Sequence, residues 1–186
     1  IKEKDQWKAV SYQWDEKQND ARISKVGDIV PISLEGEEFD YVIPNKNQCK
    51  SCHNHNEKID PLGFKYANLS GVEGQLDKLK NRDVITISRV SDDLRPMVSY
   101  KDQNHSIQDR ALAYLDANCG HCHRPEGPGN TSGLYLQYNE DRTNHLGICK
   151  APVAAGKGSG GRQFDIQPGS ADSSILYFRM ASLDPG

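Results

Sequence analysis

The sequence predicts a mainly α fold with much loop, made of two small helical units and an N-terminal β-hairpin or small sheet. Three observations predict it. A Cys-x-x-Cys-His run occurs twice, as Cys49-Lys-Ser-Cys-His53 and Cys119-Gly-His-Cys-His123, each after a segment with helical signals. The chain has 16 glycines and 9 prolines and is only 35% hydrophobic, which indicates long loops and a small core. Apolar and polar residues alternate within the first 44 positions, as in strands.

The repeated Cys-x-x-Cys-His run is the attachment signal for c-type haem. Two thiols three positions apart on a helical turn reach the two vinyl groups of one porphyrin, and the adjacent histidine falls beneath the iron as proximal ligand. We therefore predict two covalently attached haems. Each helical unit is expected to be a cytochrome c-like haem unit, because a buried porphyrin supplies the apolar surface that the composition lacks. The predicted attachment and proximal residues are Cys49, Cys52, His53, Cys119, Cys122 and His123.

Three extended runs are expected before the first motif. They are Val10–Trp14, Asp28–Leu34 and Phe39–Ile43, with turn signals at Lys17–Asp20 and Glu35–Glu37. We interpret them as a hairpin or small sheet, with no chemistry of their own.

The first haem unit is expected to begin at Asn45, which is a suitable N-cap for a short helix that carries the motif. Pro61 lies eight residues beyond His53. Its carbonyl is predicted to accept the Nδ1–H of that histidine, which fixes the ring and raises its basicity as a ligand. A short helix is predicted over Gln75–Lys80, and either a strand or a covering loop over Val84–Val90.

The second unit is expected to open with the clearest helix of the chain. Ser106 and Asp109 resemble a capping box, and the apolar positions that follow recur every three or four residues up to Cys119. Ala155–Gly161 superficially resembles a phosphate-binding loop but lacks its required residues, so we interpret it as a flexible loop. Ser170–Ser174 is predicted to cap a final helix.

The two haem units are expected to meet near residue 103. The predicted organisation is residues 1–103 for the β-containing segment with the first haem unit, and residues 104–186 for the second.

Methionine is the first choice for the sixth iron ligands. The chain has two methionines, and one follows each motif: Met97 after His53 and Met180 after His123. Thioether ligation raises the reduction potential relative to bis-histidine ligation. Met180 also fits simple core packing on the last helix. The alternative donors are His55, His105, His121 and His145.

Charge and hydropathy narrow the class of protein. The net charge of −3 argues against a nucleic-acid partner, which requires a basic surface. No apolar run approaches 18 residues, so no membrane span is expected. Because bacteria attach haem c outside the cytoplasm, the motifs predict a periplasmic or extracellular protein. The fifth cysteine, Cys149, is expected to be an unpaired thiol.

Several stretches resemble a family of exported bacterial di-haem c-type cytochromes. They are Tyr12–Ala21, Tyr41–His53, Arg110–His123, Gly147–Gly156 and Pro168–Leu176. The resemblance covers most of the chain and implies covalent haem at both motifs and electron transfer, with no known substrate. Its relatives extend further at both ends, so we expect this chain to be part of a longer product. In them a Met-Pro motif just past the position of the last residue resembles a haem ligand, which argues against Met180.

We therefore expect a di-haem c-type cytochrome that transfers electrons outside the cytoplasm, as a carrier or as a conduit or filament subunit. Its partners are redox proteins, with self-association through haem–haem contacts in the filament case. The alternative is a di-haem redox enzyme, peroxidase-like or sulfur-oxidising, for which Cys149 is of interest; Glu126 close to His123 reads as a solvated loop carboxylate. A four-cysteine zinc site is disfavoured because Cys52 and Cys119 are too far apart in sequence and zinc leaves the two histidines unexplained.

Overall fold

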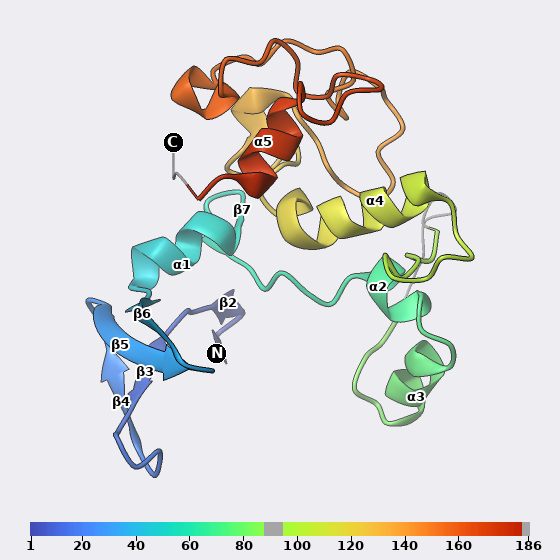
Figure 1. Cartoon of the computed structure of the whole chain (residues 1–186). Coiled ribbons are helices and arrows are strands. Elements are labelled where there is room, and N and C mark those ends of the chain that lie inside the picture. Colours follow the sequence, from blue (N-terminus) through green and yellow to red (C-terminus); the bar gives the residue numbers. More distant parts are fainter. Residues whose placement is uncertain (88–94, 184–186) are drawn as a thin grey trace. The chain divides into compact units, whose positions relative to one another are not determined.

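The computed structural model describes residues 1–87 and 95–183, and the chain divides into two compact units, Ile1–Leu62 and Gly63–Gly186 (Figure 1). The first unit contains the first Cys-x-x-Cys-His run, and the second unit contains the other. The boundary expected near residue 103 lies inside the second unit, and as a boundary between haem units it stays a prediction.

The first unit consists of short antiparallel strand pairs and one helix. Its elements are β1 (Lys2–Glu3), β2 (Gln6–Trp7), β3 (Ser11–Trp14), β4 (Ala21–Ser24), β5 (Asp28–Leu34), β6 (Glu37–Ile43), α1 (Lys46–Cys52), β7 (Asn54–His55) and β8 (Lys58–Ile59). Each strand pairs with its neighbour in sequence, which gives four two-stranded sheets in the described chain.

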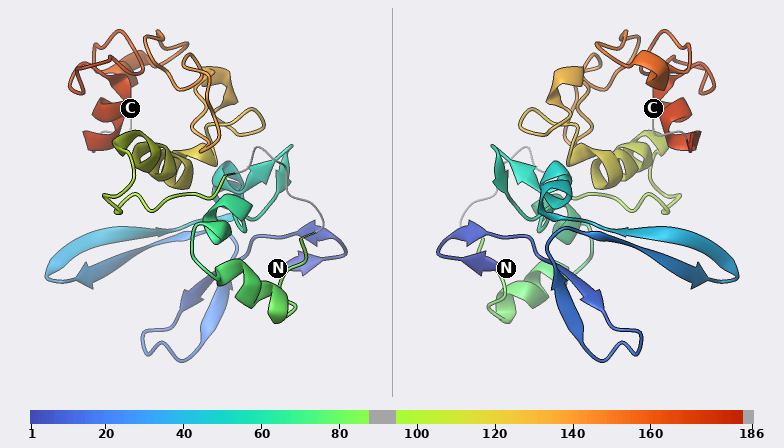
Figure 2. Two further views of the ribbon diagram at one scale, coloured as in Figure 1. Left: turned by 90° about the vertical axis from the view of Figure 1, so that its right-hand side faces the viewer. Right: turned by 90° about the vertical axis from the view of Figure 1, so that its left-hand side faces the viewer.

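The longest strand pair is the β5–β6 hairpin, visible as two long arrows in Figure 2. Its register places Ile32 opposite Phe39 and Val30 opposite Tyr41, so these apolar side chains share one face. The extended runs predicted in this region are confirmed as β3, β5 and β6. The prediction missed β4, although its four residues alternate between apolar and polar, because so short a run gives only a weak signal.

Helix α1 begins where the sequence predicts it. The Asn45 side chain accepts the backbone N–H groups of Asn47 and Gln48 at 2.9 and 3.0 Å, and the Gln48 side chain accepts the Asn45 N–H at 2.9 Å. This is a reciprocal capping box, and Asn45 is confirmed as the N-cap.

The second unit consists of short helices joined by turns. Its elements are α2 (Tyr66–Ser70), α3 (Gln75–Asn81), α4 (Ile107–Leu115), the π-turn η1 (Asp116–Gly120), the 3₁₀ turns η2 (Asn130–Ser132) and η3 (Gly156–Ser159), and α5 (Ile175–Ala181). The predicted helix over Gln75–Lys80 is confirmed as α3. Residues 84–87 form no strand, and the rest of the run predicted to end at Val90 lies outside the described residues.

The predicted helices at Ser106 and after Ser174 are confirmed as α4 and α5. The Ser106 hydroxyl accepts the Asp109 N–H at 3.0 Å, as the capping prediction requires. At α5 the cap differs from the prediction: the Ser174 hydroxyl donates to the Ser170 carbonyl at 2.9 Å and makes no hydrogen bond to the helix itself. The Ser174 side chain therefore stabilises the turn that precedes α5 instead of the first turn of the helix.

The core of the second unit is formed by two small clusters beside α4. One contains Leu112, Ala113, Tyr138 and Leu146, with Met97 and Val98 packed against it. The other contains Leu115, Leu134 and Leu136, with Tyr114, Cys119 and Leu176 packed against it. The second cluster therefore connects α4 to the haem motif and to α5.

The predicted fold class, mainly α with two cytochrome c-like haem units, is wrong. Among the described residues the five α-helices are short, the longest having 9 residues, and the strand pairs cover nearly as much of the chain. The physical reason is that glycine, proline and turn residues interrupt the helical pattern after each motif, so most of the second unit consists of turns instead of packed helices. None of the helices described here is both long and apolar enough to cross a membrane.

Candidate haem-binding sites

The two Cys-x-x-Cys-His runs adopt the same one-turn geometry in different settings. In the first, the His53 N–H donates to the Cys49 carbonyl at 2.9 Å, at the C-terminal end of α1. In the second, the His123 N–H donates to the Cys119 carbonyl, also at 2.9 Å. One helical turn therefore separates the two cysteines of each run, which is the spacing that two bonds to one porphyrin require.

The second run is held in place by a buried carboxylate. Asp116 is 5% exposed and begins the π-turn η1, which continues α4 and carries Cys119. Its carboxylate accepts the Tyr138 N–H at 2.9 Å and pairs with the ammonium of Lys65. Single π-turns within helices are frequent at functional sites, and here the turn sets the direction in which the motif leaves the helix.

A cavity of about 420 Å³ opens beside the second run. Cys119 and His123 line it together with Met180 from α5. Most of the remaining lining is apolar: Leu134, Leu136, Pro152, Val153, Ala154, Ala155, Ile175 and Leu176. The structure thus brings together three residues that the sequence analysis assigns to the second haem: Cys119 for attachment, His123 as proximal ligand and Met180 as a further donor.

His123 is held as a neutral donor. Burial lowers the pKa of its imidazole, although a backbone hydrogen bond with Leu134 and the nearby Asp165 carboxylate act in the opposite direction. The Ser132 hydroxyl lies 3.4 Å from Nδ1. A neutral imidazole has a free lone pair for iron, and a neutral acceptor on the other ring nitrogen is a common second contact of metal-bound histidine.

The residues around this cavity fit a covalently attached haem. A c-type haem uses thiols for attachment and imidazole and thioether as iron donors, and the apolar lining suits a porphyrin face. Burial also raises the pKa of the Cys119 thiol, which keeps it protonated at neutral pH. The volume lies within the usual range of small-molecule sites.

The first run lies on a more exposed element. Helix α1 buries none of its residues, and both Cys52 and His53 are exposed. The His53 carbonyl accepts the Asp60 N–H at 3.1 Å, which closes the loop of β7 and β8 onto the motif. The predicted hydrogen bond between Pro61 and the His53 ring stays a prediction.

Met97 belongs to the second unit, whereas the motif whose haem it was expected to bind, Cys49–His53, belongs to the first. Its N–H donates to the Ala67 carbonyl at 2.8 Å, and its side chain packs against the cluster that contains Leu112 and Tyr138. This is ordinary packing for a methionine. Its role as the ligand of the first haem stays a prediction.

Three of the alternative histidine donors lie in different parts of the chain and have different neighbours. His55 pairs with Lys58 across β7 and β8, and His105 lies 3.7 Å from Asp102 in an exposed turn. His145 is half-buried, and its Nδ1 lies 3.2 Å from the Glu140 carboxylate.

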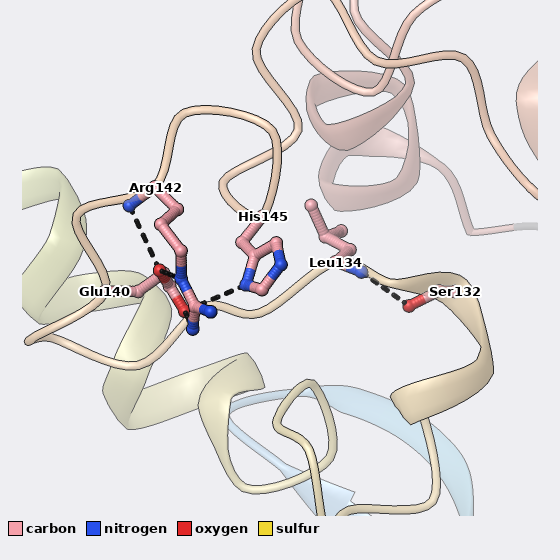
Figure 3. A network of polar contacts seen from close by, with 5 residues as sticks. All are labelled: Ser132, Leu134, Glu140, Arg142 and His145. Atoms are coloured by element: carbon pink, nitrogen blue, oxygen red, sulfur yellow. Dashed lines mark hydrogen bonds and ion pairs between the residues drawn. The ribbon is translucent and has the colours of Figure 1, made fainter.

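Glu140 connects two cations in a network that the sequence did not predict. Figure 3 shows Arg142 and His145 directed toward its carboxylate. Hydrogen bonds from Arg142 are the largest cause that lowers the pKa of Glu140 to about 2, with His145 contributing less. The Tyr135 ring packs edge-on to His145 at 4.6 Å. This network fixes the turn that follows the cavity wall at Leu134 and Leu136.

Sequence reasoning also missed Leu134, Asp165 and Arg179 as residues of the second site. Arg179 lies three and four residues after the apolar residues Leu176 and Ile175, which line the same cavity, so a helix-face argument offers a signal for it. Leu134 and Asp165 lie in turns without periodicity, and their approach to His123 depends on the tertiary fold. No spacing rule identifies them.

Comparison with known protein families, with characterised proteins and with solved structures finds no match to this chain. The resemblance to exported di-haem cytochromes therefore rests on the sequence motifs alone.

Proposed function

We propose that this chain is a di-haem c-type cytochrome that transfers electrons outside the cytoplasm, in the periplasm or at the cell exterior. The observation that carries the proposal is the cavity in which Cys119, His123 and Met180 meet. A run of Cys-x-x-Cys-His by itself gives the attachment chemistry, whereas this cavity adds an apolar site and a second iron donor.

The residues of the chain have distinct roles at the second site. Cys119 and Cys122 would hold the cofactor covalently, and the His123 imidazole and the Met180 thioether would be the donors to its iron. The haem, when bound, supplies one-electron redox chemistry at its iron. The backbone of Leu134 would orient the imidazole of His123, and the apolar part of the lining would contact the face of the porphyrin.

Cys49, Cys52 and His53 are proposed to hold the first haem in the same way, because their run has the same one-turn geometry. The sequence expectation for its further iron donor is Met97 or one of the histidines His55, His105, His121 and His145.

Electron transfer is favoured over catalysis by the side chains of the cavity. Asp165 is 7% exposed, and its carboxylate is bound to the Lys150 ammonium at 3.1 Å, so it is a poor proton donor or acceptor for a substrate. Cys149, the residue of interest for a sulfur-oxidising enzyme, is exposed and is not among the residues that line the cavity. A carrier or conduit between redox proteins needs neither group. Haem propionates add to the net charge of −3, so a basic redox partner is the natural complement.

The test is to produce the protein in a bacterial host that attaches haem to exported proteins. The intact mass of the denatured protein is expected to equal the chain plus two haems. Cys119→Ala with Cys122→Ala, and separately Cys49→Ala with Cys52→Ala, should each remove one haem, and Cys149→Ala should keep both. A wild-type mass without haem contradicts the proposal.

Ligation is tested by near-infrared spectra of the oxidised protein. A methionine–iron charge-transfer band is expected, and Met180→Ala should diminish it. If Met97→Ala diminishes it further, Met97 serves the first haem. An unchanged band in Met180→Ala assigns the second iron to another donor.

A further inference from the structure

The glycine-rich segment Ala155–Gly161 forms a wall of the cavity instead of a phosphate-binding loop. It forms the turn η3, which packs on α5. A Cβ atom at Gly158 would lie 2.0 Å from Nη1 of Arg179, and one at Gly160 would lie 2.7 Å from the Phe178 ring. Glycine at position 158 therefore leaves the space that the Arg179 guanidinium occupies.

Arg179 and Gly158 both line the cavity that contains Cys119 and His123. Within the part of the chain that the structure describes, the Arg179 guanidinium has no hydrogen-bond or ion-pair partner. The acidic residue of the same lining, Asp165, is bound to Lys150. The cavity lining thus includes an exposed cation that pairs with no neighbouring carboxylate.

Arg162 shows how the same region satisfies an arginine that has a structural role. Its Nε donates to the Asp172 carbonyl at 2.6 Å, its Nη1 donates to the Gly160 carbonyl at 3.0 Å, and its guanidinium lies 4.4 Å from the centre of the Phe178 ring. Arg162 lies outside the cavity lining. The difference between the two arginines points to a ligand for Arg179.

We infer that Arg179 binds a propionate carboxylate of the haem held by the second run. The inference rests on the proposed function, and it assigns the recognition of the polar edge of the cofactor to one residue. A guanidinium binds a carboxylate through two parallel hydrogen bonds, and such pairing is strongest in a partly apolar site. Its positive charge near the iron stabilises the reduced form over the oxidised form, so Arg179 raises the reduction potential of this haem.

The experiment compares redox titrations of the haem-loaded protein with those of Arg179→Gln, Arg179→Lys and the matched control Arg162→Gln. We expect Arg179→Gln to keep both haems by mass and to keep the methionine–iron band. For one of the two haems, the equilibrium between reduced and oxidised forms should shift about tenfold toward the oxidised form. This corresponds to a reduction potential that is lower by about 59 mV for one electron. Arg179→Lys should shift this equilibrium by less than Arg179→Gln does. Arg162→Gln should shift it by less than about twofold, which is the size of a weak surface charge effect.

An unchanged potential in Arg179→Gln, or an equal shift in Arg162→Gln, overturns the inference. If Arg179→Gln does not take up haem, Arg179→Lys decides: a shift between about twofold and tenfold supports the inference, and an unchanged potential overturns it. A wild-type protein whose mass includes no haem contradicts the proposed function itself and the inference with it. Two attached haems with unshifted potentials contradict the inference alone.

Discussion

Glu140 illustrates how single residues outside the haem motifs shape the second unit. Its side chain is only 7% exposed although it carries a charge, and it binds Arg142 at 2.8 Å and His145 at 3.2 Å (Figure 3). A carboxylate so placed stabilises the fold only while it is ionised. The turn between the two cavity-lining leucines and His145 therefore depends on pH.

We predict that Glu140→Gln lowers the free energy of unfolding at pH 7 by about 2 kcal/mol, because it removes charge-assisted hydrogen bonds. The pKa of Glu140 is lowered from 4.5 to about 2 in the folded protein. Its stabilisation is thus fully present above pH 4.5 and is lost as the pH falls toward 2. Urea unfolding of both proteins between pH 7 and pH 2.5 checks this.

The neighbouring exposed residue gives the control for Glu140. Asp141→Asn should change stability by less than about 0.5 kcal/mol. A difference between Glu140→Gln and wild type that stays constant from pH 7 to pH 2.5 contradicts the assigned role.

Asp116 is the second residue whose charge is expected to matter. Replacing it with alanine leaves the Tyr138 N–H without its acceptor and Lys65 without its partner. We predict a loss of about 2 to 4 kcal/mol, since breaking a buried pair leaves the other group uncompensated. The measurement is chemical unfolding of the haem-loaded protein. Asp116→Asn keeps an acceptor for Tyr138 and should lose less; an equal loss in both variants shows that the ion pair, not the backbone contact, dominates.

At the scale of elements, local signals predicted starts of helices and positions of strands better than their extent. Asn45, Ser106 and Gln75 each mark a helix that the structure contains. These signals are local because an N-cap and its partners lie within three residues of one another. Their ends were predicted less well: Gln75–Lys80 stops one residue short of α3, and the pattern that runs up to Cys119 divides into α4 and the π-helical η1. Where a helix ends depends on contacts across the unit, which leave no periodic pattern.

The cap of α1 gives a prediction at this scale. Asn45→Ala removes two accepted hydrogen bonds and should destabilise the helix by about 1 kcal/mol. Amide hydrogen exchange across α1 should then be faster by roughly fivefold, following the same free energy. Asn47→Ala, in the first turn of the same helix, is the control and should slow exchange or leave it unchanged. Equal exchange in Asn45→Ala and wild type shows that contacts other than the cap hold the helix.

The candidate site shows the same limit of sequence reasoning. The cysteines, the proximal histidines and Met180 follow from motif and order in the chain, and the cavity contains three of the residues expected at the second site. Asp165 reaches the surroundings of His123 from more than forty positions away. Such a contact depends on turns whose direction is set by glycine conformations and backbone hydrogen bonds, and the sequence pattern does not encode it.

For the whole molecule, the small core is the decisive property. The described chain has ten buried hydrophobic residues, and only Leu136 is nearly inaccessible. Nine of the ten belong to the second unit, around α4 and the wall of the cavity. A core of this size is marginal for so long a chain. The apolar lining of the cavity is therefore expected to complete its burial against the porphyrin.

We predict that the second unit loses its compact structure when its haem cannot attach. In Cys119→Ala with Cys122→Ala, helicity by circular dichroism should fall, and protease cleavage should concentrate in the second unit, Gly63–Gly186. The physical reason is that apolar lining residues that are exposed without the haem, Val153 and Met180, then remain in water, at a cost of about 25 cal/mol per Å² of apolar surface. Cys149→Ala, which changes an exposed thiol, should keep wild-type resistance. If the double variant remains as resistant as Cys149→Ala, the clusters beside α4 suffice to fold this unit, and the haem is an addition to a completed core instead of a part of it.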